Sequence, residues 1–373
     1  MTGDRGSAFR THGCRITDFM MHGMRCMTME NELLRVTLLL DKGADIVEFR
    51  HKKSDLDFMW RTPMGIRNPL AFTPSRSDPD GNFLDCYEGG WQELFPSIGN
   101  PCENRGAKLG IHGEACLLPW ECLVEKDTVD EVRVLLSCRM LRTPFLLEKR
   151  MTLKTGSMVL RLEERIVNEG AVEMDFMWGH HPALGGLFLD GEVYVDIPAK
   201  KARTFPISFH PAFPADVAFD WPKLPQPAIS TESGQQAADD IDLSIMPVKA
   251  GKWAGICHAH ELSEGWCAAT NPSLGLGFGL AFDRNLFPNV WLWMVYNGFD
   301  HYPWYGRTRT LAMEPYSSVP DNLPGAIAAG TSLKLGPGEE MSTTLCAVAY
   351  ESTTRVKHID SEGRVLFSTE EGI

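Results

Sequence analysis

The chain has 373 residues, of which 43% are hydrophobic, so it can form two average domains or one large all-β domain with a sizeable core. Its formal net charge of −13 at pH 7 argues against a general nucleic-acid binder and against a protein that binds anionic membranes. The ten cysteines include no CxxC pair and no short repeated spacing, so we expect reduced, mostly buried thiols instead of a zinc ribbon or a redox motif.

The N-terminal residues lack the apolar core of a secretory signal. No later window is apolar over the length that a membrane span requires. We therefore expect a soluble cytoplasmic protein with neither a membrane nor a nucleic acid as its partner.

Short runs in which apolar and polar residues alternate follow one another along the chain. The clearest covers residues 158–167, where apolar side chains at every second position oppose charged ones, the pattern of an antiparallel strand with one wet face. Similar runs cover residues 33–40, 132–138, 145–153, 192–197, 274–282, 290–296, 310–313 and 341–350, with Gly, Pro, Asn and Asp between them. Many strands and few helices predict an all-β protein, a large antiparallel two-sheet β-sandwich.

The domain organisation follows from the same pattern. Residues 30–350 are expected to form one sandwich domain, preceded by an extension or first strands at 1–29. Residues 206–249 are rich in prolines and polar residues, which predicts a long surface insertion without strands. Residues 351–373 form a C-terminal tail, either one last hairpin or a partly ordered extension.

Three segments far apart in the sequence combine titratable side chains with turn residues: 110–114, 179–182 and 312–316. A β-sandwich can bring such segments together on one face of a sheet. Residues 87–96 precede the first of them and supply aromatic rings and hydrogen-bonding groups. Apolar ring faces combined with fixed polar groups are what a sugar pocket needs.

His180 and His181 give the chain its most concentrated proton-transfer chemistry, because imidazole titrates near neutral pH. Neighbouring side chains of a strand point to opposite faces, so the two histidines are not expected to share one site. One can be functional while the other packs.

Four segments resemble motifs of the galactose mutarotase (aldose 1-epimerase) superfamily, in matching order and at roughly matching spacing over most of residues 30–350. They are the turn at 41–46, residues 89–96 followed by His112-Gly-Glu114, the run His181-Pro-Ala-Leu-Gly185, and residues 314–321. The third is similar to the element His-Pro-Tyr-Phe-Asn-Leu of the family, with Ala183 and Leu184 in place of the aromatic pair. This replacement changes a pocket wall, so the preferred sugar can differ from galactose or glucose.

The resemblance implies a mutarotase-like sandwich that binds a monosaccharide on a concave face and needs no metal or redox cofactor. It makes Glu314 the general base, His181 the general acid and His112 a substrate-binding or supporting histidine. Further candidates for substrate binding are Arg67, Trp91, Gln92, His180 and Asp300. The protein is expected to be a monomer or a homodimer.

Alternatives to a sugar epimerase remain open at this point. A non-catalytic sugar-binding or sensing protein would keep the same sandwich and aromatic pocket. A polysaccharide lyase or hydrolase is less favoured, because such chains usually add a helical domain and none is visible here. A phosphorylated sugar is also less favoured, since few basic residues lie near the three segments.

Overall fold

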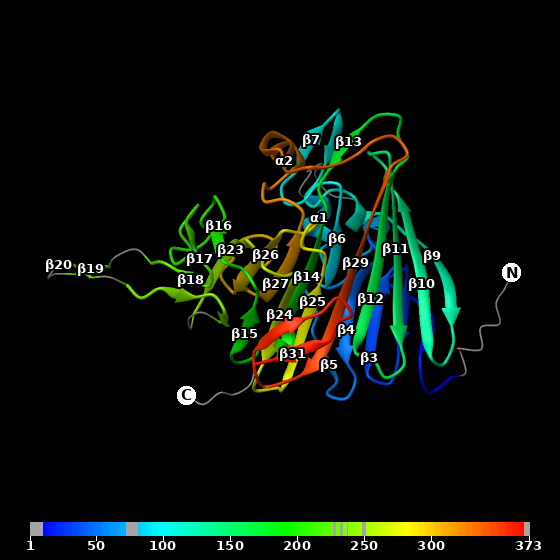
Figure 1. The fold of residues 1–373 in the computed structure, drawn as a ribbon, viewed down its shortest axis with the longest axis horizontal. Coiled ribbons are helices and arrows are strands. Elements are labelled where there is room, and N and C mark those ends of the chain that lie inside the picture. The colour runs from blue at the N-terminus through cyan, green and yellow to red at the C-terminus, as the bar shows by residue number, and fades with distance from the viewer. Residues whose placement is uncertain are drawn as a thin grey trace.

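Two large antiparallel sheets, one behind the other in the view of Figure 1, make up most of the protein. The computed structural model describes residues 10–71, 81–226, 229–231, 234–236, 238–247 and 251–368. Every pairing between its named strands is antiparallel, and two α-helices are present among these residues, α1 (Gly81–Cys86) and α2 (Leu323–Ala329). The predicted all-β, two-sheet architecture is confirmed.

The first sheet has 12 strands. In spatial order they are β1 (Arg15–Met21), β2 (Met24–Glu30), β3 (Leu34–Leu39), β4 (Asp45–His51), β6 (Trp91–Leu94), β14 (Gly179–Gly185), β27 (Arg309–Tyr316), β26 (Asn289–Tyr296), β23 (Trp253–His260), β16 (Lys201–Thr204) and β17 (Ala218–Asp220), with β5 (Leu56–Asp57) paired to β4. Strands β6, β14 and β27, which are far apart in the sequence, are therefore neighbours at its centre.

The second sheet has nine strands. Their order is β22 (Ile245–Met246), β15 (Val193–Asp196), β24 (Trp266–Asn271), β25 (Leu276–Ala281), β29 (Glu340–Glu351), β12 (Val159–Asn168), β11 (Phe145–Lys154), β10 (Glu131–Arg139) and β9 (Glu121–Asp127). Each of the nine alternating runs expected from the sequence overlaps a strand of one of the two sheets.

Smaller elements surround the sandwich. They are the strand pairs β7 (Cys102–Asn104) with β8 (Ala107–Leu109), β13 (Met174–Phe176) with β28 (Leu333–Leu335), β18 (Lys223–Leu224) with β21 (Ile241–Asp242), β19 (Ile229–Thr231) with β20 (Gly234–Gln236) and β30 (Val356–Ile359) with β31 (Val365–Phe367), and 3₁₀ turns at Pro69–Ala71, Ala115–Leu117 and Gly186–Leu189. In Figure 1 the elements α2, β7 and β13 gather at one end of the sandwich.

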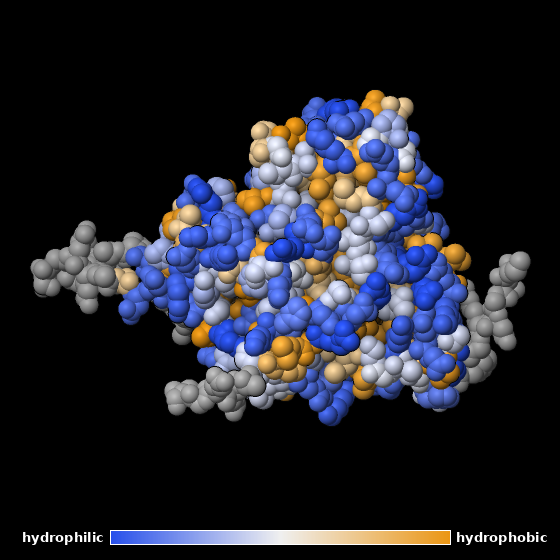
Figure 2. Space-filling model, viewed as in Figure 1, coloured by the Kyte–Doolittle hydropathy of each residue, from blue (hydrophilic) through white to orange (hydrophobic). Residues whose placement is uncertain are grey.

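The main hydrophobic core lies between the two sheets because period-2 alternation turns one side of each strand inward. Strand β12 shows this most clearly, since Leu160, Leu162 and Ile166 are fully buried. Hydrophilic residues cover much of the face shown in Figure 2. In the part of the chain that the structure describes, no helix is long and apolar enough to cross a membrane.

Residues 206–249 hold more strand than their composition predicted. The described part contributes β17 to the edge of the first sheet and forms the short strands β18 to β22. Strands of two or three residues are too short to show an alternating pattern, so the sequence gives no periodic signal for them. This region projects from one side of the sandwich in Figure 1.

The two ends of the chain also carry strands. Residues 15–30 form β1 and β2, and within the tail expected at 351–373 the described residues form the hairpin of β30 and β31. This hairpin packs a small hydrophobic cluster, which includes Val356 and Ile359, against the second sheet.

A charged network is buried between the sheets. The Lys149 Nζ atom lies 2.6 Å from Glu93 Oε2, and His180 Nε2 lies 3.1 Å from Glu164 Oε2. Trp91 Nε1 donates to His180 Nδ1 at 3.3 Å. Ionised groups with so little contact to water persist only when they are paired, so the network constrains how the sheets face each other.

Replacing Lys149 with methionine should lower the free energy of unfolding by about 3–5 kcal/mol, because two buried carboxylates lose their cation. Urea denaturation followed by tryptophan fluorescence measures the change. Lys154→Met, at an exposed position of the same strand, is the matched control and should stay within about 0.5 kcal/mol of the parent. Equal losses in the two variants would contradict the role of the network.

Candidate active site

The register of four neighbouring strands places a row of side chains on the outer face of the first sheet, away from the second sheet. Trp291 of β26 lies opposite Glu314 of β27, and His181 of β14 lies opposite Gln92 of β6. Because β14 lies between β27 and β6, the four side chains are neighbours across the strands. Residues 180–181 and 314, 133 positions apart, thereby meet.

His181 and Glu314 contact each other directly. The distance from His181 Nε2 to Glu314 Oε1 is 3.3 Å, and the two residues are 5% and 2% exposed. The hydroxyl of Tyr316 donates to the other carboxyl oxygen, Glu314 Oε2. The hydroxyl oxygen of Tyr87 lies 3.3 Å from His181 Nδ1. An imidazole and a carboxyl group are thus fixed in contact with little water around them.

Burial shifts the titration of both groups toward their neutral forms. It lowers the pKa of His181 to about 4 and raises the pKa of Glu314 to about 8. Between these values the pair holds one proton, formally on the carboxyl group. Transfer of that proton to the imidazole produces one base and one acid side by side, the combination that general acid–base catalysis requires.

His112 lies beside this pair on a loop, with its ring centroid 5.3 Å from that of His181. The backbone N–H of Gly99 donates to His112 Nδ1 at 3.2 Å, so a neutral ring carries its proton on Nε2. Burial holds the pKa of His112 well below its usual value, and His181 lowers it further. His112 therefore acts as a neutral hydrogen-bond donor.

The loop that carries His112 is held by Glu114. The carboxylate of Glu114 accepts from the backbone N–H groups of Leu141 and Arg142, both at 2.9 Å, and from the Thr143 hydroxyl at 2.9 Å. His112 itself has a φ of 63°, in the left-handed region. The anchored carboxylate stabilises a loop that turns sharply at His112.

Aromatic side chains line the outer face on both sides of the pair. One cluster includes Trp60, Phe83, Tyr87, Trp293 and Trp304. A second contains Phe205, Trp291 and Tyr316. The Trp293 ring centroid lies 5.6 Å from that of His181. Such rings can cover the apolar faces of a sugar while the polar pair reaches its hydroxyl groups.

A second charged network, under the site, fixes the segments that carry it. Lys42 is completely buried, with its Nζ atom 2.6 Å from Asp45 Oδ2 and 2.8 Å from Glu88 Oε2. Gln92 donates to Gly89 O at 2.7 Å and to Asp45 Oδ2 at 3.2 Å. Glu88 is next in sequence to Tyr87, which contacts His181 Nδ1, and Gln92 lies opposite His181 in the register. The network therefore holds residues on both sides of the His181 imidazole.

Not all of the residues expected at the site lie there. Glu314, His181, His112 and Gln92 lie together on the outer face, whereas His180 and Trp91 point to the opposite face and belong to the network between the sheets. Successive side chains of a strand point to opposite faces. His180 directly precedes His181 and Trp91 directly precedes Gln92, so His180 and Trp91 point inward.

Arg67 and Asp300 lie at the surface and do not contact the pair. Arg67 is exposed, and its Nη1 atom donates to the backbone oxygen of Asp85 at 3.2 Å. The side chain of Asp300 is 93% exposed and lies 3.3 Å from His301 Nδ1.

Tyr87 and Tyr316 lie in the segments 87–96 and 312–316 that the sequence indicated, but neither they nor the Lys42 network were predicted as parts of the site. Tyr316 could have been found, because it follows Glu314 by two positions and a strand turns such residues to one face. Nothing in the sequence pairs Tyr87 with His181, since their contact is made only when the loop after α1 folds over β14.

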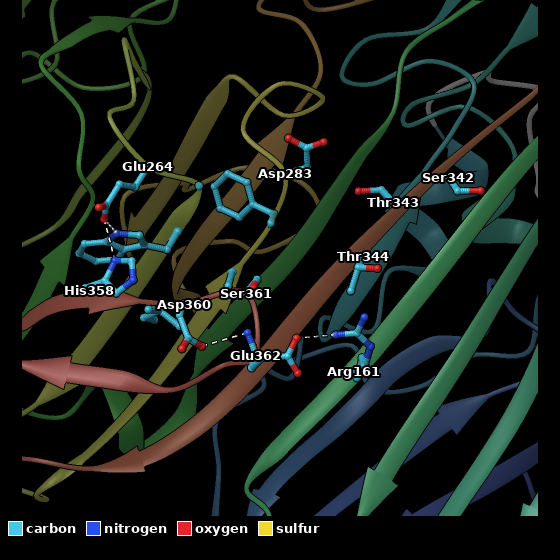
Figure 3. A pocket seen from close by; sticks show the side chains of 15 residues that line it. Arg161, Glu264, Asp283, Ser342, Thr343, Thr344, His358, Asp360, Ser361 and Glu362 are labelled. Carbon is cyan, nitrogen blue, oxygen red and sulfur yellow. Dashed lines mark hydrogen bonds and ion pairs between the residues drawn. The ribbon is translucent and has the colours of Figure 1, made fainter.

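A separate groove of about 670 Å³ lies on the second sheet, against the hairpin of β30 and β31 (Figure 3). Two pairs of its charged side chains contact each other, His358 with Glu264 at 2.8 Å and Arg161 with Glu362 at 3.6 Å. None of the residues expected at the site line it.

A family model described as a domain of unknown function, DUF4432, matches residues 21–231, more than half of the chain. The chain belongs to the DUF4432 family. No curated protein matches it.

Solved structures match nearly the whole chain at low identity. A protein from Klebsiella pneumoniae, provisionally named aldose 1-epimerase, has a TM-score of 0.67 at 14% identity and covers 91% of this chain and 88% of its own. A galactose mutarotase-like protein from Clostridium acetobutylicum has a TM-score of 0.61 at 14% identity, with 91% and 99% covered. A galactose mutarotase related enzyme from Lactobacillus acidophilus has a TM-score of 0.54 at 20% identity, with 92% and 100% covered. The fold is therefore galactose mutarotase-like.

Replacing Glu314 with glutamine should change how stability depends on pH. A carboxyl group whose pKa is raised on folding stabilises the protein fully below its unfolded pKa, and this stabilisation is lost as pH rises through the folded pKa of about 8. The free energy of unfolding of the variant, relative to the parent, should therefore rise between pH 5 and 8 by up to about 1.4 kcal/mol per pH unit.

Urea denaturation at a series of pH values measures this difference. Glu163→Gln removes a carboxylate whose side chain is 41% exposed on β12 and serves as the matched control. A constant difference between Glu314→Gln and the parent over this range would show that Glu314 is not held protonated by burial.

Proposed function

We propose that this protein is an aldose 1-epimerase or a closely related sugar epimerase, which interconverts the anomers of a monosaccharide by acid–base ring opening. The observation that carries the proposal is the 3.3 Å contact between His181 Nε2 and Glu314 Oε1 on an aromatic-lined face. In this proposal Glu314 is the general base and His181 the general acid.

The spacing of the two groups suits a cyclic hemiacetal. Its anomeric hydroxyl and its ring oxygen are bonded to the same carbon, so two groups in mutual contact can reach both. The Glu314 carboxylate takes the proton of the anomeric hydroxyl while the His181 imidazolium protonates the ring oxygen. The bond between the anomeric carbon and the ring oxygen breaks, and the anomeric C–O bond becomes a carbonyl.

The open-chain aldehyde then rotates and closes again. The hydroxyl oxygen formed from the ring oxygen attacks the other face of the carbonyl, returning its proton to His181, while the carbonyl oxygen recovers a proton from Glu314. Both side chains end in their starting states, so no net proton or electron is consumed. Each well-placed acid or base contributes about 10²–10⁴-fold to such a reaction.

The other residues of the site fit binding roles. His112 offers the N–H of Nε2 to an oxygen of the sugar, as its engaged Nδ1 requires. Trp293 and its neighbouring rings can cover an apolar ring face. Gln92 supports the site through the Lys42 network. The names of the similar solved structures point to the same reaction class.

The first test is the exchange of sugar anomers, followed by polarimetry or by NMR exchange spectroscopy over a panel of aldoses. Glu314→Gln and His181→Asn should each lower the enzyme-catalysed rate by about 10²–10⁴-fold, because each removes one proton-transfer group.

Glu163→Gln and His22→Asn make the same chemical changes at positions remote from the site, where His22 is exposed, and should keep the parental rate. Calorimetric sugar binding without any acceleration of exchange would favour a sugar-binding or sensing protein and overturn the catalytic assignment.

The pH dependence of the exchange rate gives a second test. Above a pH of about 8 the pair loses its shared proton and lacks an acid, and below about 4 both groups are protonated and the pair lacks a base. The rate should therefore pass through a maximum between these values. A rate that keeps rising above pH 9, after subtraction of the uncatalysed reaction, would contradict a pair of this composition.

A further inference from the structure

Tyr87, His181, Glu314 and Tyr316 form one chain of hydrogen-bonding groups: phenol, imidazole, carboxyl, phenol. We propose that Tyr316 and Tyr87 are positioning residues that decide which atoms of Glu314 and His181 react. Tyr316 engages Oε2, which leaves Oε1 as the base, and Tyr87 engages Nδ1, which leaves Nε2 as the acid. This inference rests on the proposed function and deepens it.

Tyr316 is held rigidly. It is 1% exposed, and its ring centroid lies 5.3 Å from that of Trp291. On the other side its ring covers Gly179, the residue opposite it in the register, so closely that a Cβ atom at Gly179 would approach Tyr316 Cδ1 to 2.1 Å. Only glycine leaves room for the ring here, and the ring in turn fixes the hydroxyl at Glu314.

Tyr87 is fixed from a different direction. Its ring stacks on Phe83 of α1 with centroids 4.7 Å apart, and it meets the His181 ring edge-on at 5.8 Å. The next residue, Glu88, is bound by Lys42. The phenol oxygen therefore stays at Nδ1 while the imidazole exchanges its proton at Nε2, facing Glu314.

The two phenols also favour the reactive charge state. A hydrogen bond donated by Tyr316 stabilises the carboxylate, so it lowers the pKa of Glu314 against the larger effect of burial. The oxygen of Tyr87 can accept from Nδ1 of an imidazolium. Both hydrogen bonds therefore stabilise the carboxylate–imidazolium form of the pair, which contains one base and one acid.

The first experiment needs no sugar. The carboxyl carbon of Glu314 is followed by NMR during a pH titration of protein labelled with ¹³C at glutamate, with the signal identified by its loss in Glu314→Gln. Tyr316→Phe should raise the pKa of Glu314 above its parental value. Gly179→Ala, which keeps the hydroxyl but displaces the ring, should do the same.

Tyr296→Phe is the matched control. Tyr296 is buried on the adjacent strand β26, and its hydroxyl has no hydrogen-bond partner within the described residues. It should leave the titration of Glu314 unchanged. An unchanged pKa in Tyr316→Phe, or an equal shift in Tyr296→Phe, would overturn the role of Tyr316.

The second experiment reads the tautomer of His181 from its ring ¹⁵N shifts. In the parent one tautomer, protonated at Nδ1, should dominate at pH 7, because Tyr87 accepts from Nδ1 and Nε2 must be free to receive the proton of Glu314. Tyr87→Phe should give a mixture of the two tautomers. A parental mixture, or an unaltered tautomer in Tyr87→Phe, would overturn the role of Tyr87. Both NMR experiments remain informative even if no sugar is turned over. Failure of this inference is therefore distinct from failure of the proposed function.

Measurement of kcat and KM distinguishes a positioning role of the two tyrosines from a role in folding alone. Tyr316→Phe and Tyr87→Phe should each lower kcat by about 10–100-fold with little change in KM, since the reacting atoms lose their alignment while the aromatic walls remain. In Tyr316→Phe the high-pH limb of the rate profile should move to higher pH, because the pKa of Glu314 rises. A rise in KM alone, with kcat unchanged, would assign these phenols to binding instead.

Discussion

The contact between His181 and Glu314 depends on the register of antiparallel strands at the centre of the first sheet. A slip of one residue in β14 or β27 would turn one member of the pair to the opposite face and remove the site altogether. The register that faces Glu314 toward His181 also places Trp291 and Gln92 on the same row. Burial of the pair then changes its protonation, which makes the sheet responsible for both the geometry and the chemistry.

Two buried lysines hold that register from opposite sides of one strand. Gln92 of β6 belongs to the Lys42 network on the outer face, and Glu93 belongs to the Lys149 network between the sheets. Lys149 is paired with Glu93 of β6, and Gln92 of β6 donates to Asp45, a partner of Lys42. Movement of β6 would therefore unpair a buried charge in one network and break a hydrogen bond in the other. Because β6 pairs with β14, the two networks also hold the strand that carries His181.

The strands were predictable because period-2 alternation in long runs is a direct consequence of burial on one face, as in β12. Glu314, His181 and His112 were predictable as a group only through motif resemblance, since no local signal in residues 314–316 names a partner far away in the chain. Applied throughout, the same alternation would have removed His180 and Trp91 from the candidate site and added Tyr316. Only short motifs indicate Arg67 and Asp300, and such motifs carry no information on exposure.

By itself the sequence determined the all-β class, the long alternating strands, and the segments that hold proton-transfer chemistry, because these depend on local alternation and side-chain type. Only the tertiary structure decided which side chains meet and in which protonation state. The contact of Tyr87 with His181, the burial that sets the pKa of Glu314 to about 8, and the separation of His180 from His181 into two networks all arise from residues distant in sequence. Desolvation and long-range hydrogen bonds have no local pattern, so they exist only once the sheets have packed.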